Sequence, residues 1–197
     1  MTANKTQSVA MTGIFAAIVI LLQVFATAIN IITPGTIPVA LVLPPIIVGA
    51  AMGGIKVGMI LGFCFGAVVL GSGIFGFAPT STMMWGVSPL IMTVGTLGRG
   101  LAVGFTAGAV YKLFAKRSPF FGVIAAAVAV PLVNTGIFTI VFFLFVEVLA
   151  EEVAGQPFFF YVSMFVLVFN FVLELIFNVV LAPTITRIIQ IVQKRKA

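Results

Sequence analysis

The stretch that decides the fold is VALVLPPIIVGAAMGGIKVGMILGFCFGAVVLGS, residues 39–72, which carries a single charged residue, Lys56. The whole 197-residue chain has the same character, with 62% hydrophobic and 7% charged residues. A soluble domain usually has roughly 25% charged residues, because its surface must contact water. In lipid, backbone groups must be satisfied internally, and long apolar stretches without alternation favour helices over barrel strands. The sequence therefore predicts an all-α integral membrane protein.

Six apolar segments divide the chain, which we expect to form one transmembrane domain over residues 1–197. Pro44 and Pro45 predict a bent or broken second segment, and Gly53-Gly54 predicts a turn directly after it. GSGIFGFAPTSTMMWGVS (71–88) is expected to be a long loop. The predicted helices span about 9–31, 39–53, 55–72, 89–111, 119–147 and 158–188.

The cations indicate how these segments are oriented. Nine of the ten lie at the two termini or in the links 2–3 and 4–5, while links 1–2, 3–4 and 5–6 contain none. Lys- and Arg-rich short loops stay in the cytoplasm. We therefore expect six crossings with both termini cytoplasmic, and the net charge of +6 reflects topology rather than nucleic-acid binding. The nine are Lys5, Lys56, Lys112, Lys116, Arg117, Arg187, Lys194, Arg195 and Lys196.

The tenth cation, Arg99, falls in the middle of the fourth segment, where a charge costs at least ~2.5 kcal/mol. Glu174 is the other charge at mid-membrane depth, and Asn170, Glu174 and Asn178 share one helix face at i, i+4, i+8. Asn134 lies in PLVNTGIF (131–138) of the fifth segment. Gln23 lies inside the first.

Two interpretations of these polar residues stay open. One is an ion pair between Arg99 and Glu174, or an amide network, that holds helices together. The other is a polar pocket in which Arg99 binds an anionic group, because a guanidinium donates two parallel hydrogen bonds to a carboxylate. The uncharged 71–88 loop, with Phe75, Phe77 and Trp85, is either an interfacial aromatic belt or a lid over such a pocket.

Small residues form stripes in three segments, and such stripes let helix backbones approach closely. They are Ala10, Gly13 and Ala17 in the first, Gly58, Gly62 and Gly66 in the third, and Gly100, Gly104 and Gly108 in the fourth. Packing within the chain is the expected role of the last two stripes. The chain has one cysteine and no histidine, so we expect neither a disulfide nor a metal site. No P-loop, HExxH or GxSxG motif is present, so we expect no enzyme and no cofactor.

Several stretches together resemble the substrate-binding S component of an energy-coupling factor (ECF) vitamin transporter. They are VAMTGIFAAIV (9–19), LPPIIVGAAMGGIKVGMILGFCFG (43–66), GRGLAVGFTAGAVYKLF (98–114) and PLVNTGIF (131–138). The resemblance implies a six-helix subunit of a prokaryotic plasma membrane that binds a vitamin near the outer face. It also implies partners, a transmembrane T subunit and two cytoplasmic ATPases, with Ala10, Gly13 and Ala17 at the T-subunit contact. Gly13 departs from the alanine usual in that motif.

Within that family, Arg99 together with Asn134 looks most like the pantothenate type. Arg99 would bind the carboxylate of pantothenate and Asn134 its amide or hydroxyls, with Trp85, Gln23, Asn170 and Glu174 as further candidate substrate contacts. Folate, another carboxylate, is the alternative vitamin. A self-sufficient membrane carrier or channel is the alternative of a different class, although no inverted repeat is visible. A structural membrane scaffold, with no ligand, is a third.

Overall fold

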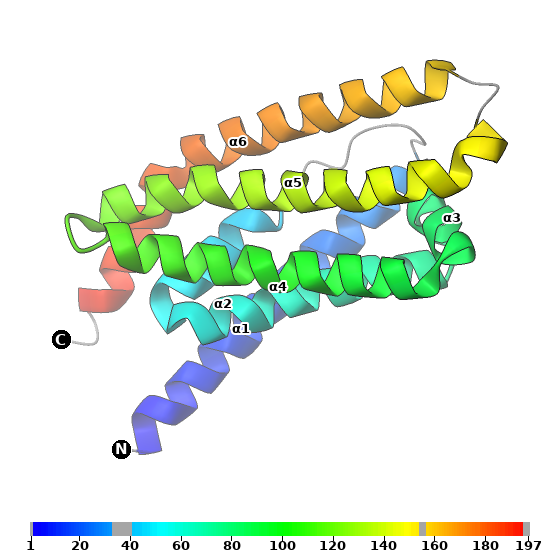
Figure 1. The fold of residues 1–197 in the computed structure, drawn as a ribbon. Helices are drawn as coiled ribbons and strands as arrows, with labels where there is room; N and C mark the ends of the chain where they lie inside the picture. The colour runs from blue at the N-terminus through cyan, green and yellow to red at the C-terminus, as the bar shows by residue number, and fades with distance from the viewer. Residues whose placement is uncertain (1, 33–40, 154–156, 195–197) are drawn as a thin grey trace.

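The protein is a bundle of helices, seen here in a computed structural model that describes residues 2–32, 41–153 and 157–194 (Figure 1). For 2–5, 30–32, 79–80, 146–153, 157–167, 170 and 192–194 it describes the backbone alone. The predicted link 33–38 lies outside the described residues. The helices are α1 (Thr2–Ile32), α2 (Leu43–Ile74), α3 (Pro79–Val87), α4 (Pro89–Phe114), α5 (Pro119–Val153) and α6 (Pro157–Lys194).

Prolines mark where these helices begin. Pro79, Pro89, Pro119 and Pro157 are the first residues of α3 to α6, a position where the missing N–H is not needed and the fixed φ suits a helix. At the start of α4 the Ser88 hydroxyl also accepts a hydrogen bond from the backbone N–H of Ile91, at 3.4 Å. The sequence thus sets the helix starts through local backbone chemistry.

The range of α2 contains two helical pieces that fold back on each other. Gly54, with φ 82° and ψ −174°, lies outside the helical region, in a conformation that only glycine adopts readily. A Cβ atom on Gly58 would lie 2.9 Å from the Cβ of Ala50, whereas residues eight apart in a straight helix are separated by about 12 Å. The predicted turn at Gly53-Gly54 is confirmed, and the chain reverses there.

The prediction of one long loop over 71–88 was wrong. α2 continues to Ile74, and residues 79–87 form the short helix α3. Between them Gly76 turns the chain with φ 77°. The polar run PTST at the start of α3 hides this helix from a search for apolar segments, because helical hydrogen bonds do not require an apolar sequence.

The other helices also run beyond their predicted ends. α1 starts at Thr2, α4 ends at Phe114, α5 reaches Val153 and α6 runs to Lys194. Helices continue into the polar flanks of an apolar stretch because the lysines, glutamines and alanines there are good helix formers.

Two glycine stripes join the second half of α2 to α4. A Cβ on Gly62 would touch the backbone oxygen of Gly100, and a Cβ on Gly58 would touch that of Gly104. At Gly66 the Thr96 oxygen would be 2.8 Å away. The two backbones are therefore in direct contact, and the expected packing role of both stripes is confirmed.

The ends of the bundle differ in charge. Gly54, Lys112, Ala115 and Pro119 line one shared cavity, so the turn within α2 and the α4–α5 link lie at the same end. The start of α1 and the end of α6 also lie at this end, whereas α3 lies at the opposite one (Figure 1). The described cations other than Arg99 thus gather where the chain has its termini.

Among the described residues, five helices are long and apolar enough to cross a membrane. They are the described parts of α1, α2, α4, α5 and α6, with α2 counted as one although it contains the Gly54 reversal. Between these helices lies a large apolar core, which includes Leu43, Ile46 and Ile47 before Gly54 and Leu61 and Phe65 after it.

The glycine contact predicts the effect of adding one methyl group. Gly62→Ala is expected to lower stability by about 1–3 kcal/mol, because the added Cβ would overlap the Gly100 carbonyl and force the helices apart. Gly98→Ala is the matched control, since a Cβ there meets no atom within 4 Å. Thermal unfolding in detergent measures both. Equal midpoints for the two variants would contradict the contact.

Candidate functional site

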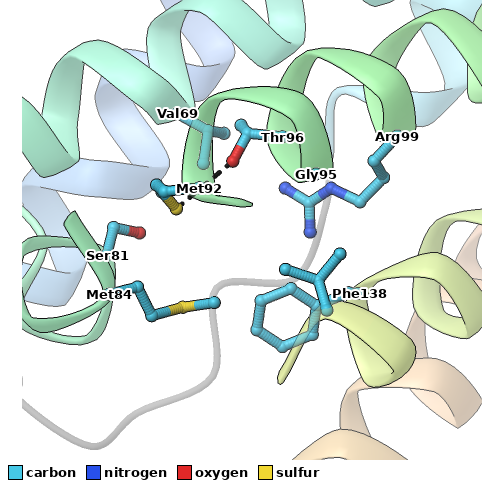
Figure 2. A pocket seen from close by; sticks show the side chains of 9 residues that line it. Val69, Ser81, Met84, Met92, Gly95, Thr96, Arg99 and Phe138 are labelled. Carbon is cyan, nitrogen blue, oxygen red and sulfur yellow. Dashed lines mark hydrogen bonds between the residues drawn. The ribbon is translucent and has the colours of Figure 1, made fainter. Parts of the chain in front are cut away.

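A small cavity lies inside the bundle, covered on one side by α3 (Figure 2). Its volume is about 20 Å³, which is room for about one water molecule. Residues from α2, α3, α4 and α5 surround it. They are Val69, Ser81, Met84, Met92, Gly95, Thr96, Arg99, Phe138 and Val141.

Arg99 is the charged residue of this lining. Its guanidinium carbon lies 5.2 Å from the centre of the Phe65 ring and 5.1 Å from that of Phe138, so each ring face can stabilise the cation. The Nε atom is buried and has no hydrogen-bond partner among the described residues. In Figure 2 the guanidinium group points from α4 toward Phe138 on α5. A buried donor of this kind is suited to an anionic acceptor.

A second polar group lies between α5 and α6. Glu174 is 1% exposed and Asn178 is fully buried. The Asn134 amide donates a hydrogen bond to the Glu174 carboxylate, at 3.2 Å to Oε2, and the Asn178 amide donates to the Glu174 backbone oxygen at 2.7 Å. Two helices are thereby joined through a buried carboxylate.

Arg99 and Glu174 interact electrostatically. Their charges are opposite, Glu174 is buried and Arg99 is half-buried, so each lowers the cost of removing the other from water. Phe138 links the Arg99 cavity to the Asn134–Glu174 hydrogen bond. It lines the cavity beside Arg99 and follows Asn134 by one helical turn. The site is thus an extended polar region, with a cation at the cavity and a carboxylate beside it.

Of the predicted site residues, some lie at or near the cavity, some lie away from its lining, and one has a side chain that is not described. Arg99 lines the cavity, and Asn134 and Glu174 hydrogen-bond to each other next to it. Trp85 is not among the lining residues and packs against the Met84, Met92 and Phe145 cluster. Gln23 lies on α1, outside the lining, and its backbone oxygen accepts a hydrogen bond from Thr27. The Asn170 side chain lies outside the described residues.

Several lining residues were not predicted. Met92, Thr96 and Arg99 share one face of α4 at i, i+4, i+7, and this spacing alone could have found the first two. Met84 and Phe138 gave no signal, since methionine and phenylalanine are ordinary components of an apolar core. α3 brings Met84 to the site, and that helix was itself not predicted.

A larger cavity, about 330 Å³, lies at the end of the bundle where the termini are. Ala50, Gly108, Tyr111 and Lys112 are among its lining residues. Lys112 comes thirteen residues after Arg99 in one helix, or about 20 Å along its axis. This cavity is therefore separate from the Arg99 site, and its lysine is exposed.

The small-residue stripe of α1 faces outward. Ala10, Gly13 and Ala17 are all exposed, and a Cβ on Gly13 would meet no atom within 4 Å. Gly13 thus differs from Gly58, Gly62, Gly100 and Gly104, which lie directly against another helix backbone. The surface is free to receive another helix or lipid.

A comparison with known protein families supplies the class. Residues 7–186 match the family described as ECF transporter, substrate-specific component. The chain belongs to this family, and it is a multi-pass membrane subunit of a transporter rather than an enzyme. No curated protein and no solved structure matches the chain.

Membership defines the general role of the protein. A substrate-specific component binds a small molecule and works with a T subunit and ATPases of an ECF transporter. Among the described residues, Arg99 combines a charged side chain, a buried Nε without a hydrogen-bond partner and a place in the lining of a cavity.

The Asn134–Glu174 hydrogen bond predicts a cost for losing the amide. Asn134→Val is expected to destabilise the protein by about 1–3 kcal/mol, because the buried carboxylate loses a donor. Thr139→Val is the matched control in the same helix, since it removes only a hydroxyl that donates to the Thr135 backbone oxygen. Chemical unfolding in detergent compares them. A control variant as destabilised as Asn134→Val would contradict this role.

Proposed function

We propose that this chain binds pantothenate at the Arg99 cavity and delivers it to an ECF transporter. The observation that carries the proposal is the half-buried Arg99 guanidinium, which lies against two phenyl rings and has a buried, unpartnered Nε at a cavity. A carboxylate would accept hydrogen bonds from this planar group in a bidentate geometry. The ligand class is therefore a carboxylic acid.

The rest of the lining favours a compact aliphatic ligand over a large flat one. Val69, Met84, Met92 and Val141 supply branched and thioether side chains, and Phe138 is the aromatic member of the lining. Thioethers adapt to irregular aliphatic shapes. Folate would add two ring systems that such a lining stacks poorly. The unpaired Asn134 Oδ1 is a nearby acceptor for an amide or hydroxyl of pantothenate.

Binding must enlarge the cavity. Its volume of about 20 Å³ is far below the roughly 300 Å³ or more of typical ligand pockets. α3 contributes Ser81 and Met84 to the lining and is flanked by the Gly76 turn and by Ala78 and Ser88, both extended. Outward movement of α3 would open the cavity, so this helix takes the role of a lid.

The orientation follows from charge. Lysine- and arginine-rich ends stay in the cytoplasm, which places both termini, the Gly54 turn and the α4–α5 link inside and α3 outside. With the reversal at Gly54 the chain would cross the membrane six times. The exposed Ala10, Gly13 and Ala17 would then lie in the inner half of α1, where a T subunit in contact with cytoplasmic ATPases can meet them.

Binding to purified protein tests the substrate. Pantothenate should bind the wild-type chain by calorimetry, and Arg99→Ala should weaken it about 10- to 100-fold through loss of a charged hydrogen bond. Arg117→Ala is the matched control, because Arg117 also lies over a phenyl ring, Phe121 at 5.3 Å, but is exposed in the α4–α5 link.

Other outcomes have distinct meanings. Folate binding without pantothenate binding would move the assignment to the other carboxylate vitamin. Unchanged affinity in Arg99→Ala would remove the proposed anion site. Pantothenate flux into liposomes that contain this chain alone would indicate a self-sufficient carrier.

The α1 surface predicts a variant that fails in assembly and not in folding. Gly13→Leu should leave the melting temperature near wild type, because no described atom lies within 4 Å of its Cβ, but it should reduce co-purification with the T subunit. Gly136→Leu on α5 is the control, with equally open space around its Cβ. Equal co-purification of both variants would contradict the α1 contact.

A further inference from the structure

Glu174 is a carboxylate in an unusual place. It is 1% exposed in the chain, accepts from Asn134 at 3.2 Å, and interacts electrostatically with Arg99. Arg99 is the same cation that the proposed ligand would bind. A second carboxylate at Arg99 would leave two negative charges beside one positive charge inside the bundle, an arrangement that surroundings poor in water strongly disfavour.

Two acceptors beside Glu174 have no donor. The Oδ1 atoms of Asn134 and Asn178 are buried without a hydrogen-bond partner among the described residues, although both amide nitrogens donate, to the Glu174 carboxylate and to its backbone oxygen. An ionised carboxylate can only accept hydrogen bonds, whereas a protonated carboxyl carries an O–H donor. A proton on Glu174 would therefore supply a donor of the kind that these acceptors lack, and it would also remove a charge.

We next consider which other titratable or charged residues are described on the helices that pack against α6. α6 packs against α5 and α2. Over 119–145, α5 has no titratable residue, and α2 carries Lys56, exposed near the Gly54 turn, and Cys64. Arg99 on α4 is the charged partner. The described part of α6 beyond Glu174 adds Arg187, which is exposed near the end of the helix.

We infer that Glu174 is a proton-binding site, and that an anionic ligand enters the Arg99 site together with one proton. The proton comes from bulk water and forms an O–H bond on the Glu174 carboxyl, while the ligand carboxylate stays ionised against the guanidinium. The buried site then holds one negative and one positive charge before and after binding. This inference rests on the proposed function, because it requires a carboxylate ligand at Arg99.

Calorimetry on the purified chain tests it. Pantothenate binding is measured in buffers of different ionisation enthalpy, which reports protons taken up, and across pH at constant salt. Uptake of about one proton per ligand is expected, with affinity falling up to tenfold for each unit of rising pH where that proton is taken up. Glu174→Gln, a neutral isostere, should bind without uptake and without this pH dependence. Pantothenol, in which a hydroxymethyl group replaces the carboxylate, should bind without proton uptake.

The outcomes separate the inference from the proposed function. Arg99-dependent pantothenate binding with no proton uptake would overturn the inference and leave the function intact. Uptake that persists in Glu174→Gln would also overturn it, as would affinity that follows Na⁺ concentration instead of pH. Absence of any carboxylate binding would overturn the function itself. The buffer series on wild type decides the question even where Glu174→Gln does not fold.

Discussion

The direct backbone contact between α2 and α4 is the constraint on which the rest of the bundle depends. Gly58, Gly62 and Gly66 meet Gly104, Gly100 and Thr96 with no side chain between them. Lipid offers little hydrophobic drive for helices to associate, so close packing of this kind must supply the attraction. It also fixes the rotation of α4 about its axis. Gly100 must face α2, and Arg99, its neighbour in sequence, is thereby turned toward Phe65 and Phe138.

The position of Arg99 explains why its charge is tolerated inside the bundle. Two ring faces and the nearby Glu174 stabilise the cation, yet its Nε keeps no hydrogen-bond partner among the described residues. A purely structural arginine would be expected to have its donors satisfied. The incomplete satisfaction of Arg99, and of the Asn134 and Asn178 oxygens, is consistent with a site that gains interactions when a substrate arrives.

The family gives these features a common purpose. A substrate-specific component must hold its small molecule firmly enough to select it and must then release it to a transporter. Under the proposed function, the cavity covered by α3 would capture the substrate, Arg99 would select an anionic group, and the exposed small-residue face of α1 would dock on the T subunit. Binding a proton with the anion would keep the buried charge constant while the subunit passes between these states.

The sequence alone determined the all-helical membrane class, the helix starts at Pro89 and Pro119 and the turn at Gly54, and it singled out Arg99 as a charge inside an apolar segment, because these depend on local backbone chemistry and on the cost of charge in lipid. Tertiary structure decided what that charge contacts. The Asn134–Glu174 bond links residues forty apart, and α3, with its polar start, brings Met84 over the cavity. Trp85 and Gln23 were plausible by composition but do not line the cavity, since the direction of a side chain depends on how each helix is rotated in the bundle, and no single segment encodes that rotation.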